Sequence, residues 1–99
     1  MKIILDDLRE FPTEGYYNCF RTYDECILFL SVFKDITYVS LDYNLNSTYT
    51  GYDVLIYMHE HGIQPKHINI HSNDDKGSYA MVAYIEENFP LSNITQNQL

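Results

Sequence analysis

A short apolar run that ends in two acids is the feature that most limits how this chain can fold. Ile3, Ile4 and Leu5 form a continuous aliphatic segment, and Asp6 and Asp7 follow it directly. A strand that is apolar on both sides is typical of a parallel sheet, where both faces are buried. The run therefore predicts a short strand at the centre of a parallel sheet.

The rest of the chain alternates between strand-like and helix-like patterns. Residues 8–15 contain Pro12 and Gly15 and predict a loop. The elements expected after it are a strand over 17–21, a helix over 23–33, a strand over 37–41, a helix from 51 to 62, a strand over 67–71 and a helix from 77 or 78 to 89. Thr22 and Glu25 form a capping box before the first of these helices.

This order of elements predicts a compact α/β domain of the doubly wound type. We expect four mainly parallel strands in the order 2-1-3-4, with three helices distributed over both faces. The strand over 67–71 alternates between polar and apolar residues, so we expect it at an edge. The domain is expected to span residues 1–90, followed by a polar C-terminal tail over 91–99.

Charge narrows the classes of partner. The 99 residues include 14 Asp and Glu against six Lys and Arg, a net charge of -8. Such a charge opposes binding to a long nucleic acid, although a metal ion or a helix N-terminus can still attract a small phosphorylated ligand. The apolar runs are too short to span a membrane, and no signal peptide is visible, so we expect a cytoplasmic protein.

Three acids are expected to converge at one edge of the sheet. Asp6 and Asp7 end the first strand, and Asp42 ends the strand over 37–41, which is its neighbour in the predicted order. Converging carboxylates repel one another unless a cation neutralises them. Mg²⁺ or Mn²⁺, held by carboxylates, waters and phosphate oxygens, is the cofactor that this pattern predicts. The structural alternative is that Asp6 or Asp42 caps a loop or a helix.

Other side chains at the same edge are candidates for binding phosphate. His71 and Ser72 end the last predicted strand and could transfer a proton or bind a phosphoryl oxygen. Lys76 and Gly77 precede a helix whose backbone N–H groups could hold an anion, and Arg9 could reach back over the pocket. A buried histidine, a turn-capping serine, a surface lysine and a surface ion pair are the structural alternatives.

Four motifs together resemble a known family. They are Leu-Asp-Asp-Leu-Arg at 5–9, Ser-Leu-Asp at 40–42, Thr-Gly-Tyr-Asp-Val at 50–54 and Ile-His-Ser at 70–72. Over about residues 2–89 the chain resembles the cyclic-phosphate-processing receiver-like domains, whose fold is similar to that of response-regulator receivers. The resemblance implies an acidic metal pocket that acts on cyclic phosphate groups of nucleotides or of RNA ends.

The resemblance also implies roles for particular residues. Asp6, Asp7 and Asp42 match the family's metal-site acids, and Asp42 and His71 are the residues expected to take part in the chemistry. Arg9, Ser72 and Gly77 match family positions, and together with Asn73 and Lys76 they are the residues expected to contact phosphate.

The chain departs from the family pattern at the third strand and in the following loop. The family reads Leu-Asp-His-Asp-Leu where this chain has Tyr43 and Asn44 at the third and fourth of these positions. The family's Asn two places past the serine is Asp74 here, with Asn73 beside it. Tyr43 is a poor proton shuttle near neutral pH and Asn44 cannot act as a base, so hydrolysis is affected more than binding.

Three functions are compatible with these observations. The first is a metal-dependent cyclic phosphodiesterase or phosphoesterase, a hydrolase that binds a cyclic-phosphate-containing nucleotide. The second is a catalytically depleted protein that sequesters a nucleotide, such as a phage-type anti-defence sponge. The third is a stand-alone receiver that is phosphorylated on Asp42. Ordinary receivers have a fifth strand that ends in a lysine, which contacts the phosphoryl group, and no such strand is expected here, so this function is the weakest of the three. An exposed edge at 67–71 would permit a homodimer.

Overall fold

The computed structural model describes residues 1–12 and 15–97. Five parallel strands form one sheet in this part of the chain, in the order β2-β1-β3-β4-β5. They are β1 (Lys2–Leu5), β2 (Tyr17–Phe20), β3 (Tyr38–Leu41), β4 (His67–Ile70) and β5 (Asn93–Gln96). The parallel α/β class and the order of the first four strands are confirmed, and β1 lies inside the sheet as its apolar sequence predicts.

The helices of the described chain are α1 (Tyr23–Val32), α2 (Gly51–Glu60) and α3 (Asp75–Asn88). Each begins at a polar capping residue: the Thr22 hydroxyl accepts the Glu25 N–H, and the Asp74 carboxylate accepts the Gly77 N–H. At α2 the Thr50 N–H donates to the Asp53 carboxylate. Because Asp74 is the cap, α3 starts two residues before the expected Gly77.

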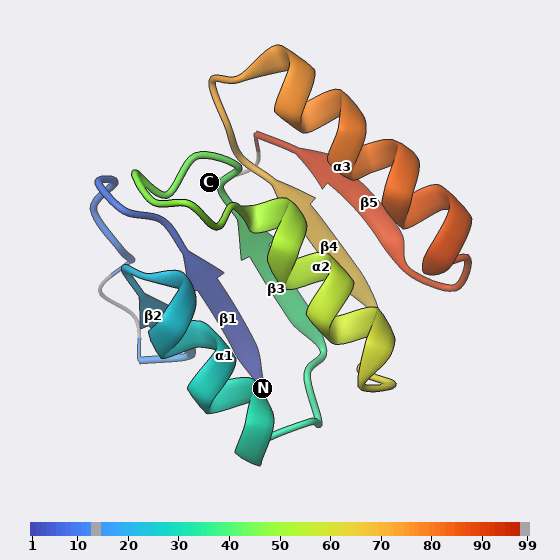
Figure 1. Cartoon of the computed structure of the whole chain (residues 1–99). Helices are drawn as coiled ribbons and strands as arrows, with labels where there is room; N and C mark the ends of the chain where they lie inside the picture. The colour runs from blue at the N-terminus through green and yellow to red at the C-terminus, as the bar shows by residue number, and fades with distance from the viewer. Residues whose placement is uncertain (13–14, 98–99) are drawn as a thin grey trace.

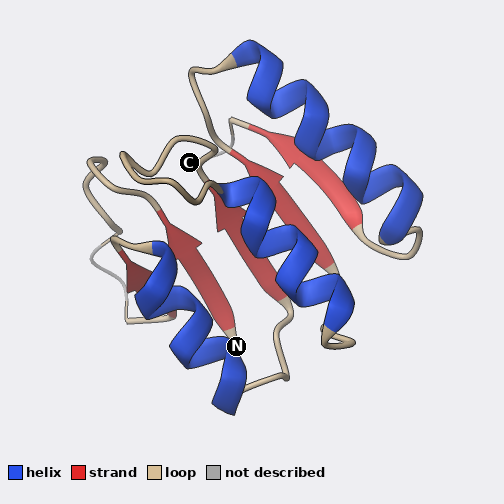
Figure 2. Cartoon of the chain, in the orientation of Figure 1, coloured by secondary structure: helices blue, strands red, loops and turns tan. Residues whose placement is uncertain are grey.

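All helices of the described residues cover the same face of the sheet, which corrects the expectation of helices on both faces (Figures 1 and 2). The connections that contain these helices all step in one direction across the sheet, from β2 to β3, β4 and β5. Crossover connections between parallel strands are right-handed, so connections that step in the same direction across the sheet place their helices on the same face. The connection from β1 to β2 steps the other way, and its described residues form no helix.

The helix-covered face contains the hydrophobic core. Its strand residues are Ile3, Leu5, Val39, Leu41, Ile68 and Ile70, which pack against buried side chains of α1, α2 and α3. Ile4 is buried but lies outside this cluster, because successive side chains of a strand point to opposite faces. The opposite face has no helix among the described residues, and we call it the open face.

The fifth strand was not expected. β5 forms within the predicted polar tail, pairs with β4 and makes β4 an inner strand rather than an edge. The alternation of β4 therefore reflects polar residues on the open face and not an edge position. The last two residues of the predicted tail, and residues 13–14 of the predicted loop, lie outside the described chain. β5 carries no lysine and ends at Gln96.

No helix in the described ranges 1–12 and 15–97 is both long enough and apolar enough to cross a membrane.

Candidate functional site

The site lies at the carboxyl ends of three neighbouring strands. Asp6, Asp42 and His71 each follow directly after β1, β3 and β4. The backbone pairing continues for one residue beyond the strands, because Asp42 N–H donates to the Leu5 carbonyl and His71 N–H donates to the Leu41 carbonyl. The sheet itself thus holds these three side chains at one level, at the edge where ligands bind in open parallel sheets.

The expected acidic cluster is present. Asp6, Asp7 and Asp42 each place a carboxylate oxygen within 4.8 Å of the others. Burial, together with the negative charges of Asp6 and Asp7, raises the pKa of Asp42 to about 6. Three oxygen donors at this spacing, with like charges that nothing in the described chain fully neutralises, fit a hard divalent cation.

Asp6 is the most firmly held of the three acids, and it is only 4% exposed. Its Oδ1 accepts the backbone N–H groups of Leu8 and Arg9 at 2.8 and 2.7 Å, and its Oδ2 accepts Nε2 of His71 at 2.9 Å. Burial opposes ionisation of Asp6, but these hydrogen bonds and His71 outweigh it and lower its pKa. Asp6 is therefore a fixed carboxylate at neutral pH.

His71 is buried beneath this edge, with 1% of its surface exposed. Its Nε2 contacts Asp6, and its Nδ1 lies 2.6 Å from the hydroxyl oxygen of Ser40. Burial lowers the pKa of His71, and the nearby Arg9 charge lowers it further, whereas Asp6 raises it. Both ring nitrogens are hydrogen-bonded inside the protein. The sequence left open whether His71 is catalytic or a buried structural residue. In this structure it is buried, and neither ring nitrogen is free.

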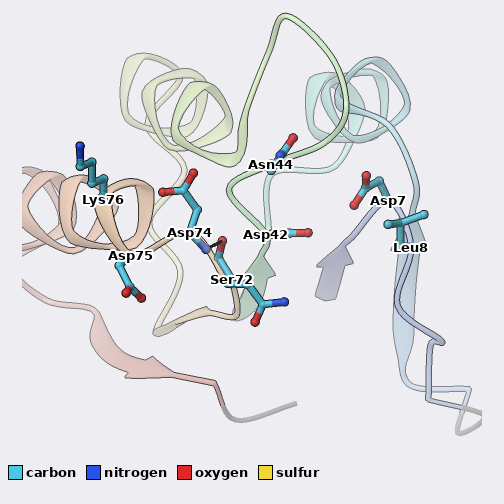
Figure 3. A pocket seen from close by; sticks show the side chains of 9 residues that line it. Asp7, Leu8, Asp42, Asn44, Ser72, Asp74, Asp75 and Lys76 are labelled. Carbon is cyan, nitrogen blue, oxygen red and sulfur yellow. Dashed lines mark hydrogen bonds between the residues drawn. The ribbon is translucent and has the colours of Figure 1, made fainter.

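Two adjoining pockets open over the acids. The larger, of about 550 Å³, is lined by Asp7, Leu8, Asp42, Asn44 and residues 72–76 (Figure 3). The smaller, of about 290 Å³, is lined by Asp6, Asp7, Leu8, Arg9, Asp42 and residues 71–73. The predicted phosphate contacts Arg9, Ser72, Asn73 and Lys76 therefore all border this space. Figure 3 places Asp42 between Asp7 on one side and Ser72 and Asp74 on the other.

Gly77 has a different environment from the one predicted. It does not line either pocket, and its N–H donates to the Asp74 carboxylate at 2.8 Å. A Cβ atom at this position would lie 2.3 Å from the ring of Tyr43. The glycine therefore allows Tyr43 to pack against the start of α3, and Tyr43 is not among the residues that line the two pockets.

Comparison with known proteins agrees with this geometry. Residues 1–87 match the family model of the cyclic-phosphate processing receiver domain. The chain belongs to this family. Searches of curated proteins and of solved structures found no match. The matched residues of this receiver domain include all the acids and both pockets, and they stop before β5.

Several residues of the receiver domain's site escaped sequence reasoning. Asp75 and Leu8 line the larger pocket, and Asp75 adds a further negative charge to its border. Ser40 and Asn69 are fully buried, and Ser40 holds Nδ1 of His71. A polar residue at the centre of an otherwise apolar strand was the available signal for Ser40. Asn69 carried no such signal, because β4 alternates throughout.

Proposed function

We propose that this domain binds a cyclic-phosphate-containing nucleotide through a divalent cation, Mg²⁺ or Mn²⁺, held by Asp6, Asp7 and Asp42. The convergence of three carboxylate oxygens within 4.8 Å, beside a pocket of about 550 Å³, is the observation that carries this proposal. Membership of the cyclic-phosphate processing receiver family supports the choice of ligand.

The side chains around the pocket have complementary tasks in this proposal. The bound cation would supply positive charge that neutralises the phosphate and polarises its bonds to oxygen. Arg9, whose side chain is 40% exposed and lies 3.7 Å from Asp6, can turn its guanidinium onto a phosphate oxygen. Ser72 and Asn73 can donate hydrogen bonds, and the Lys76 ammonium at the outer border adds attraction for an anion.

The arrangement favours binding of the ligand over its hydrolysis. Hydrolysis is accelerated by a group that takes a proton from the attacking water, and a histidine with a free ring nitrogen is the usual choice. Among the described residues that line the pockets, His71 is the sole histidine, and both of its nitrogens are hydrogen-bonded. Tyr43 and Asn44 replace the family's His and Asp, so they restore no base. Sequestration of an unchanged nucleotide is therefore the form of the proposal that we favour.

Calorimetry with defined ligands tests the proposal. Mg²⁺ and Mn²⁺ are titrated into the metal-free protein, followed by nucleoside 2′,3′-cyclic phosphates, 3′,5′-cyclic nucleotides, cyclic dinucleotides and linear nucleoside monophosphates. We expect cation binding, and cation-dependent binding of at least one cyclic class that exceeds binding of the linear nucleotides. Chromatography of the recovered ligand should return it unchanged; a ring-opened product would instead identify a hydrolase.

Two variants separate the site from general charge effects. Asp42→Asn removes one of the carboxylates and should abolish cation binding. Glu86→Gln changes the net charge by the same amount on an exposed part of α3 and should leave binding intact. A folded wild-type protein that binds neither cation nor any of these nucleotides would reject the proposal.

A further inference from the structure

Behind the acidic pocket, a line of hydrogen-bonded side chains runs through the strands on the open face. His71 links Asp6 to Ser40, with distances of 2.9 Å to Asp6 Oδ2 and 2.6 Å to Ser40 Oγ. Asn69 Nδ2 donates to the same Ser40 oxygen at 2.9 Å. Ser40 and Asn69 are directly paired in the register of β3 and β4 and are fully buried. The line therefore continues from the pocket into the sheet.

The line then reaches β5, the strand that sequence reasoning missed. The Thr95 hydroxyl donates to Asn69 Oδ1 at 2.8 Å, and Nε2 of His67 lies 2.7 Å from the same hydroxyl oxygen. Thr95 pairs with Asn69 in the register of β4 and β5. The polar residues thus follow one row across three adjacent strands.

The hydrogen bonds can all point in one direction, toward Asp6. Because Asn69 donates to Ser40 Oγ, the hydroxyl proton of Ser40 is free to donate to Nδ1 of His71. The proton of a neutral His71 ring then resides on Nε2, where the Asp6 carboxylate requires a donor. Reversing the direction would leave Nε2 of a neutral ring without a proton against a carboxylate, which is an unfavourable pair of acceptors.

The position of this row argues for a role beyond filling space. The centre of a buried parallel strand ordinarily carries aliphatic residues, which need no hydrogen-bond partner. Here both Ser40 and Asn69 are polar, and every buried polar side-chain atom in the described residues has a partner. Ser40 and Asn69 also contact the Tyr38 hydroxyl on the same face, but along the row their hydrogen bonds lead to His71, and His71 leads to the acid.

We propose that Ser40 and Asn69 are positioning residues for the acidic pocket, which hold the His71 ring in its Nε2–H form against Oδ2 of Asp6. The functional benefit of this arrangement rests on the proposed cation binding, whereas its geometry does not. Backbone N–H groups fix Oδ1 of Asp6 and the His71 ring fixes the rotation of the carboxylate, which leaves Oδ2 a second lone pair for a ligand in the pocket that Asp6 lines.

The first test uses nitrogen-15 NMR of His71 near neutral pH. The wild-type ring should show a proton on Nε2 that exchanges slowly with water, and a hydrogen-bonded, unprotonated Nδ1. Ser40→Ala removes the donor to Nδ1, so the Nδ1 resonance should move to that of a free nitrogen and Hε2 should exchange at least several-fold faster. Ser40→Thr keeps the hydroxyl and should preserve the wild-type signals.

The second test measures Mg²⁺ affinity of the same proteins. Groups that orient metal ligands typically change affinity by about 10- to 100-fold, so Ser40→Ala should weaken Mg²⁺ binding by about 10-fold. Asn69→Leu, which removes the donor to Ser40 but fills the site with apolar atoms, should weaken binding likewise while keeping the fold. Ser31→Ala, whose hydroxyl only donates to the Leu28 carbonyl on exposed α1, is the matched control.

The outcomes are distinct for the two proposals. If Ser40→Ala and Asn69→Leu leave the His71 signals as in the wild type, or if they lower thermal stability alone while Mg²⁺ affinity is unchanged, the positioning role is wrong. If the wild type binds no Mg²⁺, the proposed function fails, whereas the NMR signals of His71 still decide whether Ser40 and Asn69 hold the ring.

Discussion

Nε2 of His71 lies 2.9 Å from Oδ2 of Asp6, although β3 separates the strands that these residues follow. Ser40 of β3 holds the other side of the ring, because its hydroxyl is hydrogen-bonded to Nδ1 of His71. A buried carboxylate is stable only where donors surround it, and here the backbone of Leu8 and Arg9 supplies two of them and His71 the third. The edge of the sheet thus holds an acid in a charged state before any ligand arrives.

Replacing His71 with Ala should destabilise the fold. The substitution leaves Oδ2 of Asp6 and the Ser40 hydroxyl without their partner and opens a cavity, so we expect a loss of about 2–4 kcal/mol in the free energy of unfolding. Chemical denaturation measures it. His59→Ala, on the exposed end of α2, should change stability by less than about 0.5 kcal/mol. Equal effects of the two substitutions would contradict the buried role of His71.

Asp42 should make the metal-free protein less stable as the pH rises. Its pKa in the folded state is about 6, above its ordinary value of 3.8, so between these values the folded state binds more protons than the unfolded state. Stability from this group is therefore present at low pH and is lost as the pH rises through about 4 to 6. Because the lowered pKa of buried His71 makes stability rise with pH over part of the same range, the decline is measured as the difference between the wild type and Asp42→Asn in thermal melts in EDTA at pH 5.0 and 7.5.

The same carboxylate offers a test that needs no nucleotide. Asp42→Asn removes the repulsion, so it should raise the melting temperature at pH 7.5 in EDTA and remove the loss of stability with rising pH that Asp42 causes. Mg²⁺ should stabilise the wild type but not this variant, because binding to the folded state alone stabilises it. If the metal-free wild type and Asp42→Asn changed equally in stability between pH 5.0 and 7.5, the charge of Asp42 would be compensated in the folded protein.

The sequence contained enough to place the acids but not the row behind them. Asp6 and Asp42 follow apolar strands in a βαβ order, and parallel topology alone brings such residues to one edge. His71 was placed at that edge as well. Its orientation depends on Ser40 and Asn69, which are paired in the register of β3 and β4. The hydrophobic pattern fixes the face on which each of them lies but leaves open which residues pair.

Two errors about the fold have physical causes. β5 has only Ile94 as an aliphatic residue among polar ones, so its pattern is that of a tail, and it forms because β4 offers backbone partners and Ile94 packs against the core. The helices were expected on both faces because doubly wound sheets ordinarily bury both. The direction of each crossover, which follows from strand order, decides the face instead.

Gly51 should tolerate no side chain. A Cβ atom there would lie 2.1 Å from the backbone oxygen of Asp42, and backbone cannot give way as a flexible side chain can. Gly51→Ala should therefore displace the start of α2 or the Asp42 loop, with a loss of at least about 1–3 kcal/mol and weaker Mg²⁺ binding. Gly15→Ala, where a Cβ meets nothing within 4 Å, is the control. Denaturation and calorimetry that find the two variants alike would contradict this account.

Arg9 should matter for the phosphate more than for the cation. Its backbone N–H, which any residue provides, holds Asp6, whereas its half-exposed guanidinium borders the smaller pocket. A charge-assisted hydrogen bond contributes about 1.5–3 kcal/mol, so Arg9→Ala should weaken nucleotide binding by about 10-fold or more. Cation affinity should stay the same or rise, because a positive charge near Asp6 is removed.

Lys34→Ala removes a positive charge between the end of α1 and the start of β3, at the end of the strands opposite the pocket, and should leave both affinities unchanged. Calorimetry of the three proteins with Mg²⁺ and then with a cyclic nucleotide measures both quantities. If Arg9→Ala weakened cation binding and left the nucleotide affinity unchanged, the guanidinium would be orienting Asp6 and not contacting phosphate.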